Sequence, residues 1–213
     1  MYHGPYIGTA AEKQPKRILI LGESHHDIPP AMTTQQVVNG YLEGKHVQFF
    51  QNIAKSFGIY AERAEEKVLF WDKIFFGNYI DISLDGPSGE GDQTAKKLIA
   101  VYEGRYNLDL ANFVNHHQIN TIFCFGLTTV FDHLPGNHYA GILPSEDGSM
   151  IADKKLGKNG KLEIAGYLCE QSPETYDHPV RIYGMTHPSD HWHGFSPEPF
   201  VEYLKPVFED CCK

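Results

Sequence analysis

Four short apolar runs along the chain have the length and composition of buried strands. They contain four to seven residues each, and the second is rich in aromatic side chains. Runs of this kind are typical of parallel strands that are covered on both faces. The sequence therefore predicts strands at Ile18–Leu21, Ile74–Ile80, Thr121–Gly126 and Val180–Met185.

The segments between these runs have apolar residues at three- and four-residue spacing, which predicts helical crossovers. We expect helices at Thr33–Phe57 in two pieces, Glu62–Lys73, Thr94–His117 with a break at Gly104, Thr128–Leu134, and Ser196–Phe208. A small antiparallel excursion is expected around Lys161–Leu168. Strands that alternate with helices predict an α/β fold, here a three-layer α/β/α sandwich with a central four-stranded parallel sheet.

The length of 213 residues suits one domain. Residues 1–16 contain two glycines and two prolines and are predicted to form an extended N-terminal arm, followed by a single domain at residues 17–213. No apolar run approaches the ~20 residues that span a bilayer, and the N-terminal residues lack the apolar core of a signal peptide. We expect a cytoplasmic monomer without membrane contact.

Polar clusters directly follow the first and last predicted strands. The first segment, Arg17–Pro30, reads RILILGESHHDIPP, and the last, Val180–Ser196, reads VRIYGMTHPSDHWHGFS. In open α/β sheets the ligand crevice lies outside the carboxyl ends of the strands. The two polar clusters are therefore expected to form loops that line one site.

A first-strand Gly-Glu loop paired with a last-strand His-Pro-Ser loop resembles the uracil-DNA glycosylase superfamily. The resemblance covers about Arg17 to Ser196. It implies hydrolysis of the N-glycosidic bond of a flipped uracil or modified base in single- or double-stranded DNA, without a cofactor. It leaves the identity of the base open.

The resemblance assigns catalytic roles to three residues. His187 matches the histidine that donates to the base carbonyl oxygen as negative charge develops there. Glu23 matches the Gly-Glu of some members. Others use an aspartate one position later to activate water, and Ser24 stands there in this chain. Glu23 or Asp27 would have to replace that aspartate.

The resemblance also assigns binding residues. Asn78 lies near the position of a base-reading asparagine, whose carboxamide can pair with a pyrimidine edge. His25 and His26 follow the first strand, where the family places a ring that excludes the thymine methyl group. The expected DNA contacts come from Ser189, His191 and Trp192.

Composition limits this interpretation in two ways. The net charge of −9 argues against broad electrostatic binding of DNA, because lysine and arginine contacts supply most of that affinity. The four cysteines lack the spacing of an iron–sulfur cluster, which some members of the superfamily carry. We expect no metal and no cofactor.

Two alternatives remain open. A metal-dependent hydrolase of a phosphoester or nucleoside would use ligands from the two polar clusters, namely His25, His26, Asp27, His187, Asp190, His191 and His193. No HExxH or similar signature supports it. A non-catalytic nucleotide- or protein-binding module with the same fold is the other alternative, which the missing aspartate and the acidic charge favour.

Overall fold

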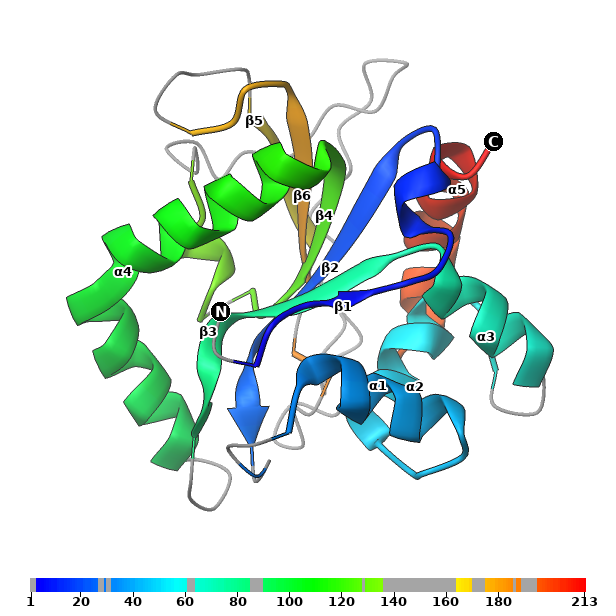
Figure 1. The fold of residues 1–213 in the computed structure, drawn as a ribbon, viewed down its shortest axis with the longest axis horizontal. Coiled ribbons are helices and arrows are strands. Elements are labelled where there is room, and N and C mark those ends of the chain that lie inside the picture. Colours follow the sequence, from blue (N-terminus) through cyan, green and yellow to red (C-terminus); the bar gives the residue numbers. More distant parts are fainter. Residues whose placement is uncertain are drawn as a thin grey trace.

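A computed structural model describes residues 3–26, 29, 32–60, 64–84, 90–127, 129–135, 164–169, 175–185, 187–188 and 195–213. Its centre is a six-stranded sheet in the order β1-β3-β2-β4-β6-β5. The strands are β1 (Tyr6–Ile7), β2 (Arg17–His26), β3 (Phe75–Leu84), β4 (Ile119–Phe125), β5 (Ile164–Cys169) and β6 (Val180–Met185) (Figure 1).

The four predicted strands are confirmed and form a contiguous parallel block, β3-β2-β4-β6. The prediction of a sheet with only these four strands was wrong. β1 adds antiparallel to β3, and β5 adds antiparallel to β6 as the expected excursion near Lys161–Leu168. Both edges of the parallel block are thus covered by short antiparallel strands, which limits the exposure of unpaired backbone groups.

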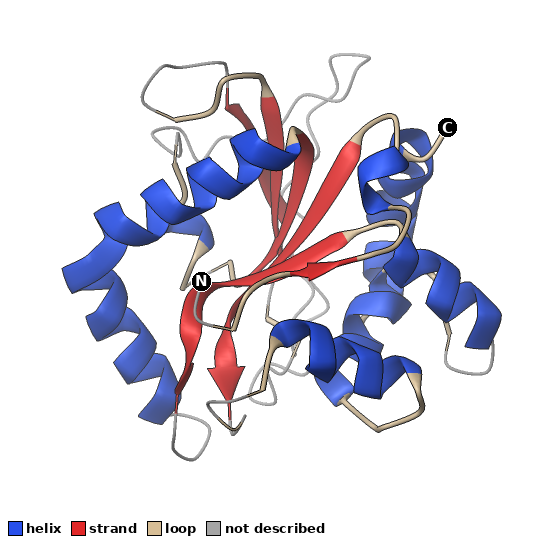
Figure 2. Cartoon of the chain, viewed as in Figure 1, coloured by secondary structure: helices blue, strands red, loops and turns tan. Residues whose placement is uncertain are grey.

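Helices cover both faces of the sheet (Figure 2). On one face lie α1 (Thr34–Leu42), α2 (Gln48–Ser56), α3 (Ala64–Asp72) and α5 (Val201–Cys211), and on the other lies α4 (Glu90–His117). Successive strand residues alternate between the faces, so Ile18 and Ile20 pack in the first core while Leu19 and Leu21 pack in the second. Within the described residues, no helix has the length and apolar character required to cross a membrane.

The first two parallel strands extend further than the apolar runs. Gly22–His26, predicted as a loop, continues β2, and Asp81–Leu84 continues β3. The reason is mutual pairing, because Ser24 lies opposite Ile80 and His26 lies opposite Leu84, with a register shift after Ser24. The polar residues that follow the apolar run of β2 are therefore held in the sheet.

Two helix predictions need correction. α4 is continuous through Gly104, where a break was expected, because a single glycine inside a helix costs only about 0.5–1 kcal/mol relative to alanine. The predicted helix Thr128–Leu134 is only a 3-10 turn at Phe131–His133, because the backbone N–H groups of residues 129–131 all donate to the carbonyl of Gly126.

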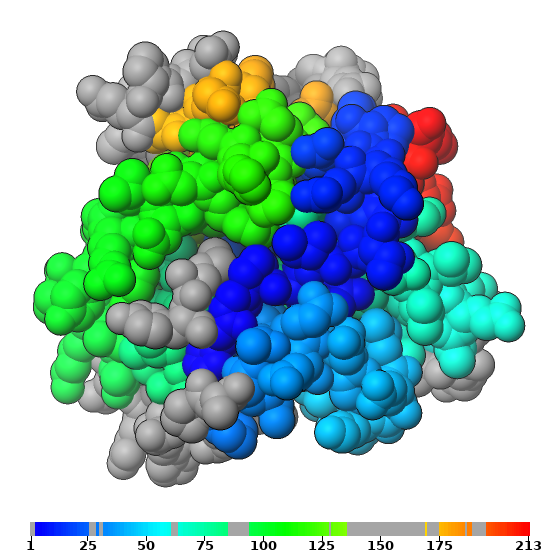
Figure 3. Space-filling view, viewed as in Figure 1, coloured from blue at the N-terminus to red at the C-terminus, as the bar shows by residue number. Residues whose placement is uncertain are grey.

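The N-terminal segment is part of the packed structure. Tyr6 and Ala11 are buried, and the backbone N–H of Gly8 donates to the carbonyl of Ile74 at 3.0 Å. The space-filling view shows this segment, in dark blue, lying between α4 and α1 (Figure 3). It therefore covers the outer edge of β3 rather than extending away from the domain.

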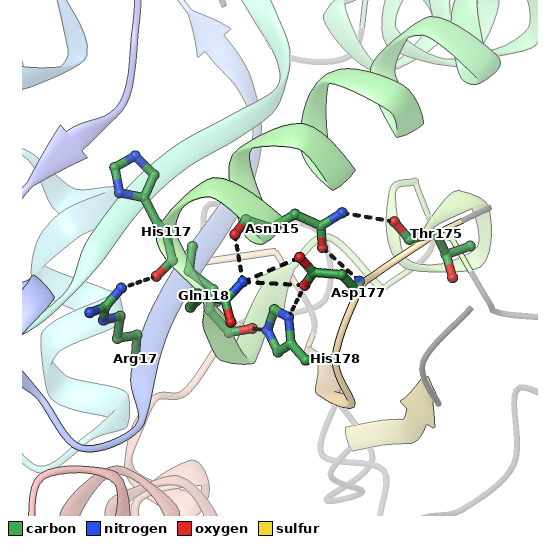
Figure 4. A network of polar contacts seen from close by, with 8 residues as sticks. Arg17, Asn115, His117, Gln118, Thr175, Asp177 and His178 are labelled. Atoms are coloured by element: carbon green, nitrogen blue, oxygen red, sulfur yellow. Dashed lines mark hydrogen bonds and ion pairs between the residues drawn. The ribbon is translucent and has the colours of Figure 1, made fainter. Parts of the chain in front are cut away.

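A polar network fixes the amino ends of the parallel strands (Figure 4). Asn115, at the end of α4, accepts from the backbone N–H of Asp177, and the side chain of Gln118 donates to the Asp177 carboxylate. His178 Nδ1 forms a hydrogen bond with the same carboxylate, and His178 Nε2 lies 2.8 Å from the carbonyl oxygen of Ile119. The hydrogen bond with His178 is the main reason why the pKa of Asp177 is lowered. This network ties α4 to the starts of β4 and β6, at the end of the sheet opposite the polar motifs.

We predict opposite effects of alanine at two glycines. A Cβ at Gly184 of β6 would lie 2.4 Å from the buried ring of Phe131, so Gly184→Ala should lower the free energy of unfolding by about 1–3 kcal/mol. Gly104→Ala introduces no contact within 4 Å to a described residue and should raise it by about 0.5–1 kcal/mol, because alanine favours the helix. Urea denaturation measures both. Equal effects of the two substitutions would contradict this packing.

Candidate functional site

The topology of the sheet marks one end as the candidate site. In chain order the parallel strands are β2, β3, β4 and β6, but in space β2 lies between β3 and β4. The direction of the crossovers therefore reverses between β2 and β4. Ligands of such sheets bind outside the carboxyl ends of the strands at this reversal. The polar part of the first motif lies at the carboxyl end of β2, and the second motif follows the carboxyl end of β6, next to β4.

Gly22 and Asn78 lie side by side at this end of the sheet, on the face that α2 covers. The two residues are paired across β2 and β3, and Asn78 Oδ1 lies only 2.3 Å from where a Cβ of Gly22 would be. Only glycine leaves room for the carboxamide. Asn78 is 3% exposed, and within the described part of the chain its Oδ1 has no hydrogen-bond partner. An unsatisfied buried acceptor of this kind costs about 1–3 kcal/mol.

Phe49 of α2 connects Asn78 with the second motif. Its Cζ lies 3.2 Å from the Cβ position of Gly22, and its ring centroid lies 5.3 Å from that of His187. Both rings are half-buried. The structure therefore brings Asn78 and His187, predicted from separate motifs, to one aromatic side chain.

Phe49 was not among the predicted site residues. Its periodicity assigned it to the core together with Phe50. Adjacent residues on a helix point about 100° apart, so only one of the two could face the sheet squarely. Phe50 does so and is buried, whereas Phe49 turns toward His187. The Phe-Phe pair was a signal that one ring was available for another role.

The same helix positions the second motif. Asn52, one turn after Phe49, donates from Nδ2 to the carbonyl oxygen of Pro188 at 2.8 Å. Its Oδ1 accepts from Gln48 Nε2 at 2.7 Å, which fixes the orientation of the carboxamide. α2 thus holds the backbone beside His187 and supplies the ring that His187 contacts.

Glu23 lies on the other face of β2. It is 3% exposed, and strand alternation directs it to the side of Leu21, which faces α4. Burial raises the pKa of the Cys124 thiol on that side, and the negative charge of Glu23 raises it further. Glu23 therefore points away from the face that carries Asn78 and Phe49.

His25 belongs to a separate buried cluster. Its Nε2 lies 3.0 Å from Thr34 Oγ1 and 3.9 Å from Asp81 Oδ1, and its ring contacts that of His3 at 4.7 Å. The backbone N–H of His3 donates to Asp81 Oδ2 at 3.1 Å. Burial raises the pKa of Asp81, and this hydrogen bond opposes the shift. The geometry gives His25 the role of joining β2, α1 and the N-terminal segment.

Several predicted residues lie outside the described part of the chain: Asp27, Ser189, His191 and Trp192, together with the side chain of His26. Asp190 and His193, two further ligands of the metal alternative, lie outside it as well. Among the residues that the structure does describe, no group of three or more histidine, cysteine, aspartate or glutamate side chains could hold a metal ion.

Comparison with known proteins finds no family model and no curated protein that matches the chain.

The raised pKa of Asp81 predicts a pH dependence of stability. The folded protein holds the Asp81 proton to higher pH than the unfolded chain, so the free energy of unfolding falls as pH rises from about 3.9 to the folded pKa. Asp81→Asn removes this contribution. The difference in unfolding free energy, variant minus wild type, should therefore increase as pH rises above about 3.9, the pKa of an unfolded aspartate, and become constant above the folded pKa. Urea denaturation across this range tests it, and a constant difference would show that Asp81 does not contribute.

Proposed function

We propose that the chain hydrolyses the N-glycosidic bond of a base flipped out of DNA. The base would lie against Phe49, with its edge at Asn78 and a carbonyl oxygen near His187. Such a reaction requires a donor aimed at the base as it becomes an anion and a group that reads the base edge. The two motifs and the topology of the sheet support this assignment.

One observation carries the proposal: the buried Oδ1 of Asn78 without a partner in the described residues. A protein rarely leaves a buried acceptor unpaired, and such cases often mark a functional role. The ring N–H of a uracil-type base would supply the missing donor. Because Phe49 and Asn78 both lie beside Gly22, a planar base stacked on Phe49 could present this donor to Asn78.

The supporting residues have distinct chemical roles. Phe49 offers a half-buried ring face for base stacking, which contributes about 1–3 kcal/mol per base. His187 would donate to the base oxygen as the bond breaks, which requires only a neutral imidazole with its proton on the facing nitrogen.

Asp27 is the better candidate for activating water. Glu23 faces α4, whereas Asp27 is the remaining carboxylate of the first motif. Glu23→Gln and Asp27→Asn would separate these roles when both are measured on the same substrate.

The function is tested with oligonucleotides that carry uracil, hypoxanthine, xanthine or 5-hydroxymethyluracil, in single- and double-stranded form. Alkali converts abasic sites into breaks, and each reaction is run with and without chelator. We expect chelator-resistant abasic sites for at least one base. Breaks without alkali that disappear with chelator would favour the metal-dependent alternative. The absence of reaction on every substrate would contradict the proposal.

Replacement of His187 should affect turnover far more than folding. Loss of one transition-state donor typically lowers the rate about 10²- to 10³-fold. Because the half-buried ring contributes little to the core, His187→Ala should lower the unfolding free energy by less than about 1 kcal/mol. Single-turnover cleavage and urea denaturation measure the two effects. His46→Ala, at an exposed position before α2, is the matched control and should change neither.

Replacement of Asn78 should separate stability from activity. Asn78→Leu removes an unsatisfied buried acceptor, so the unfolding free energy should stay unchanged or rise by about 1 kcal/mol while base excision is lost. Asn52→Leu is the comparison, because it breaks two hydrogen bonds and should destabilise the fold by about 1–3 kcal/mol. A similar loss of stability in both variants would show that Asn78 is structural.

A further inference from the structure

A cavity lies on the face of β3 opposite Asn78. It has a volume of about 350 Å³, within the range of small-molecule sites. β3 contributes one wall and α4 the other, and no described residue of the two sequence motifs lines it. The lining residues used below are Tyr79, Asp81, Tyr102, Arg105, Tyr106 and Asp109.

Three tyrosine rings form a connected aromatic wall in this cavity. The ring centroids of Tyr79 and Tyr106 are 5.5 Å apart with planes inclined by 58°, and those of Tyr102 and Tyr106 are 6.3 Å apart and inclined by 65°. The hydroxyl of Tyr79 donates to Asn107 Oδ1 at 2.7 Å, which fixes its ring. Inclined rings are an ordinary arrangement of neighbouring aromatic side chains, and here they place three rings along one wall of the cavity.

The charges in the cavity favour a cation. Arg105 Nε lies 3.9 Å from Asp109 Oδ2, and both side chains are largely exposed, so their charges offset each other at the rim. Asp81 is the buried carboxylate of the lining, and it also accepts from the backbone N–H of His3 and lies 3.9 Å from His25 Nε2. A carboxylate beside several aromatic faces is the arrangement that attracts a desolvated organic cation, because the ring faces carry negative electrostatic potential.

We propose that this cavity binds a methylated ammonium group. The group would be held by the faces of Tyr79, Tyr102 and Tyr106 and by the charge of Asp81. Two sources share this chemistry: a small quaternary ammonium compound and a trimethylated lysine side chain. The site is distinct from the proposed base site, because Asn78 and Tyr79 are neighbours in β3 that point to opposite faces.

Calorimetric titration of the full chain with choline tests the cation. The neutral control is 3,3-dimethylbutan-1-ol, which has the same shape without the charge. A short glycine–serine peptide with one trimethyl-lysine tests the second source. We expect binding of choline or of the peptide, and at least about tenfold weaker binding of the neutral alcohol. The tighter of the two charged ligands identifies the source.

Variants at Tyr102 locate the site. Tyr102 is 46% exposed, so its replacement leaves the core intact. Tyr102→Leu should weaken binding about five- to tenfold, whereas Tyr102→Phe keeps the ring face and should bind as the wild type does. Tyr60→Leu removes an exposed tyrosine outside the cavity and should have no effect. Asp81→Asn should also weaken binding, with thermal unfolding as the check that the variant is folded.

Three results would overturn the proposal. One is equal binding of choline and the neutral alcohol, which would show an apolar cavity without cation selectivity. Another is no binding of either charged ligand up to about 10 mM. The third is undiminished binding in Tyr102→Leu, which would place the cation elsewhere. None of these readouts requires DNA or catalysis, so each is independent of the proposed glycosylase activity.

Discussion

The pairing of β2 with β3 is the constraint on which the rest of the structure depends. These two strands stay paired well beyond their apolar parts, to His26 and Leu84. The pairing sets Gly22 opposite Asn78 and carries Glu23, His25 and Asp81 into the sheet. Buried polar groups are expensive unless they are paired with other groups or reserved for a ligand. The polar end of this strand pair therefore contains both the residues that stabilise the fold and those of the candidate site.

Helix α2 holds together the residues of the candidate site at this end of the sheet. It contributes Phe50 to the core, Phe49 to the space beside Asn78, and Asn52 to the backbone of the second motif. One short helix, which belongs to neither motif, thereby contacts residues of both. The cavity on the opposite face depends on α4 in a comparable way, because a single helix face supplies two of its three tyrosines.

The sequence predicted much of the fold because apolar runs and helical spacing are local signals. All four parallel strands and the antiparallel excursion before Val180 were predicted. The carboxyl ends of β2 and β3 were not predicted as strand. Their polar residues suggest a loop in the sequence, and only the pairing of the two strands keeps them in the sheet. β1 was missed since two residues are too few to create a pattern.

The candidate site was predictable only in part. Asn78 and His187 could be selected by resemblance, and the structure brings both to Phe49. The side of the sheet on which Glu23 lies depends on strand alternation past Gly22, and the contacts of His25 depend on the N-terminal segment. Neither is encoded in the motif itself. The aromatic cavity lies between β3 and α4, and no pattern in the sequence predicted it.

The alternation of β3 also has a thermodynamic consequence. Asn78 and Tyr79 share one peptide unit but serve opposite faces, so a small shift of this strand moves both side chains at once. Any coupling of binding free energy between the proposed base site and the proposed ammonium site would be reciprocal. A ligand that draws β3 toward α4 would alter the affinity at Asn78, and a base at Asn78 would alter the affinity on the α4 side by the same factor.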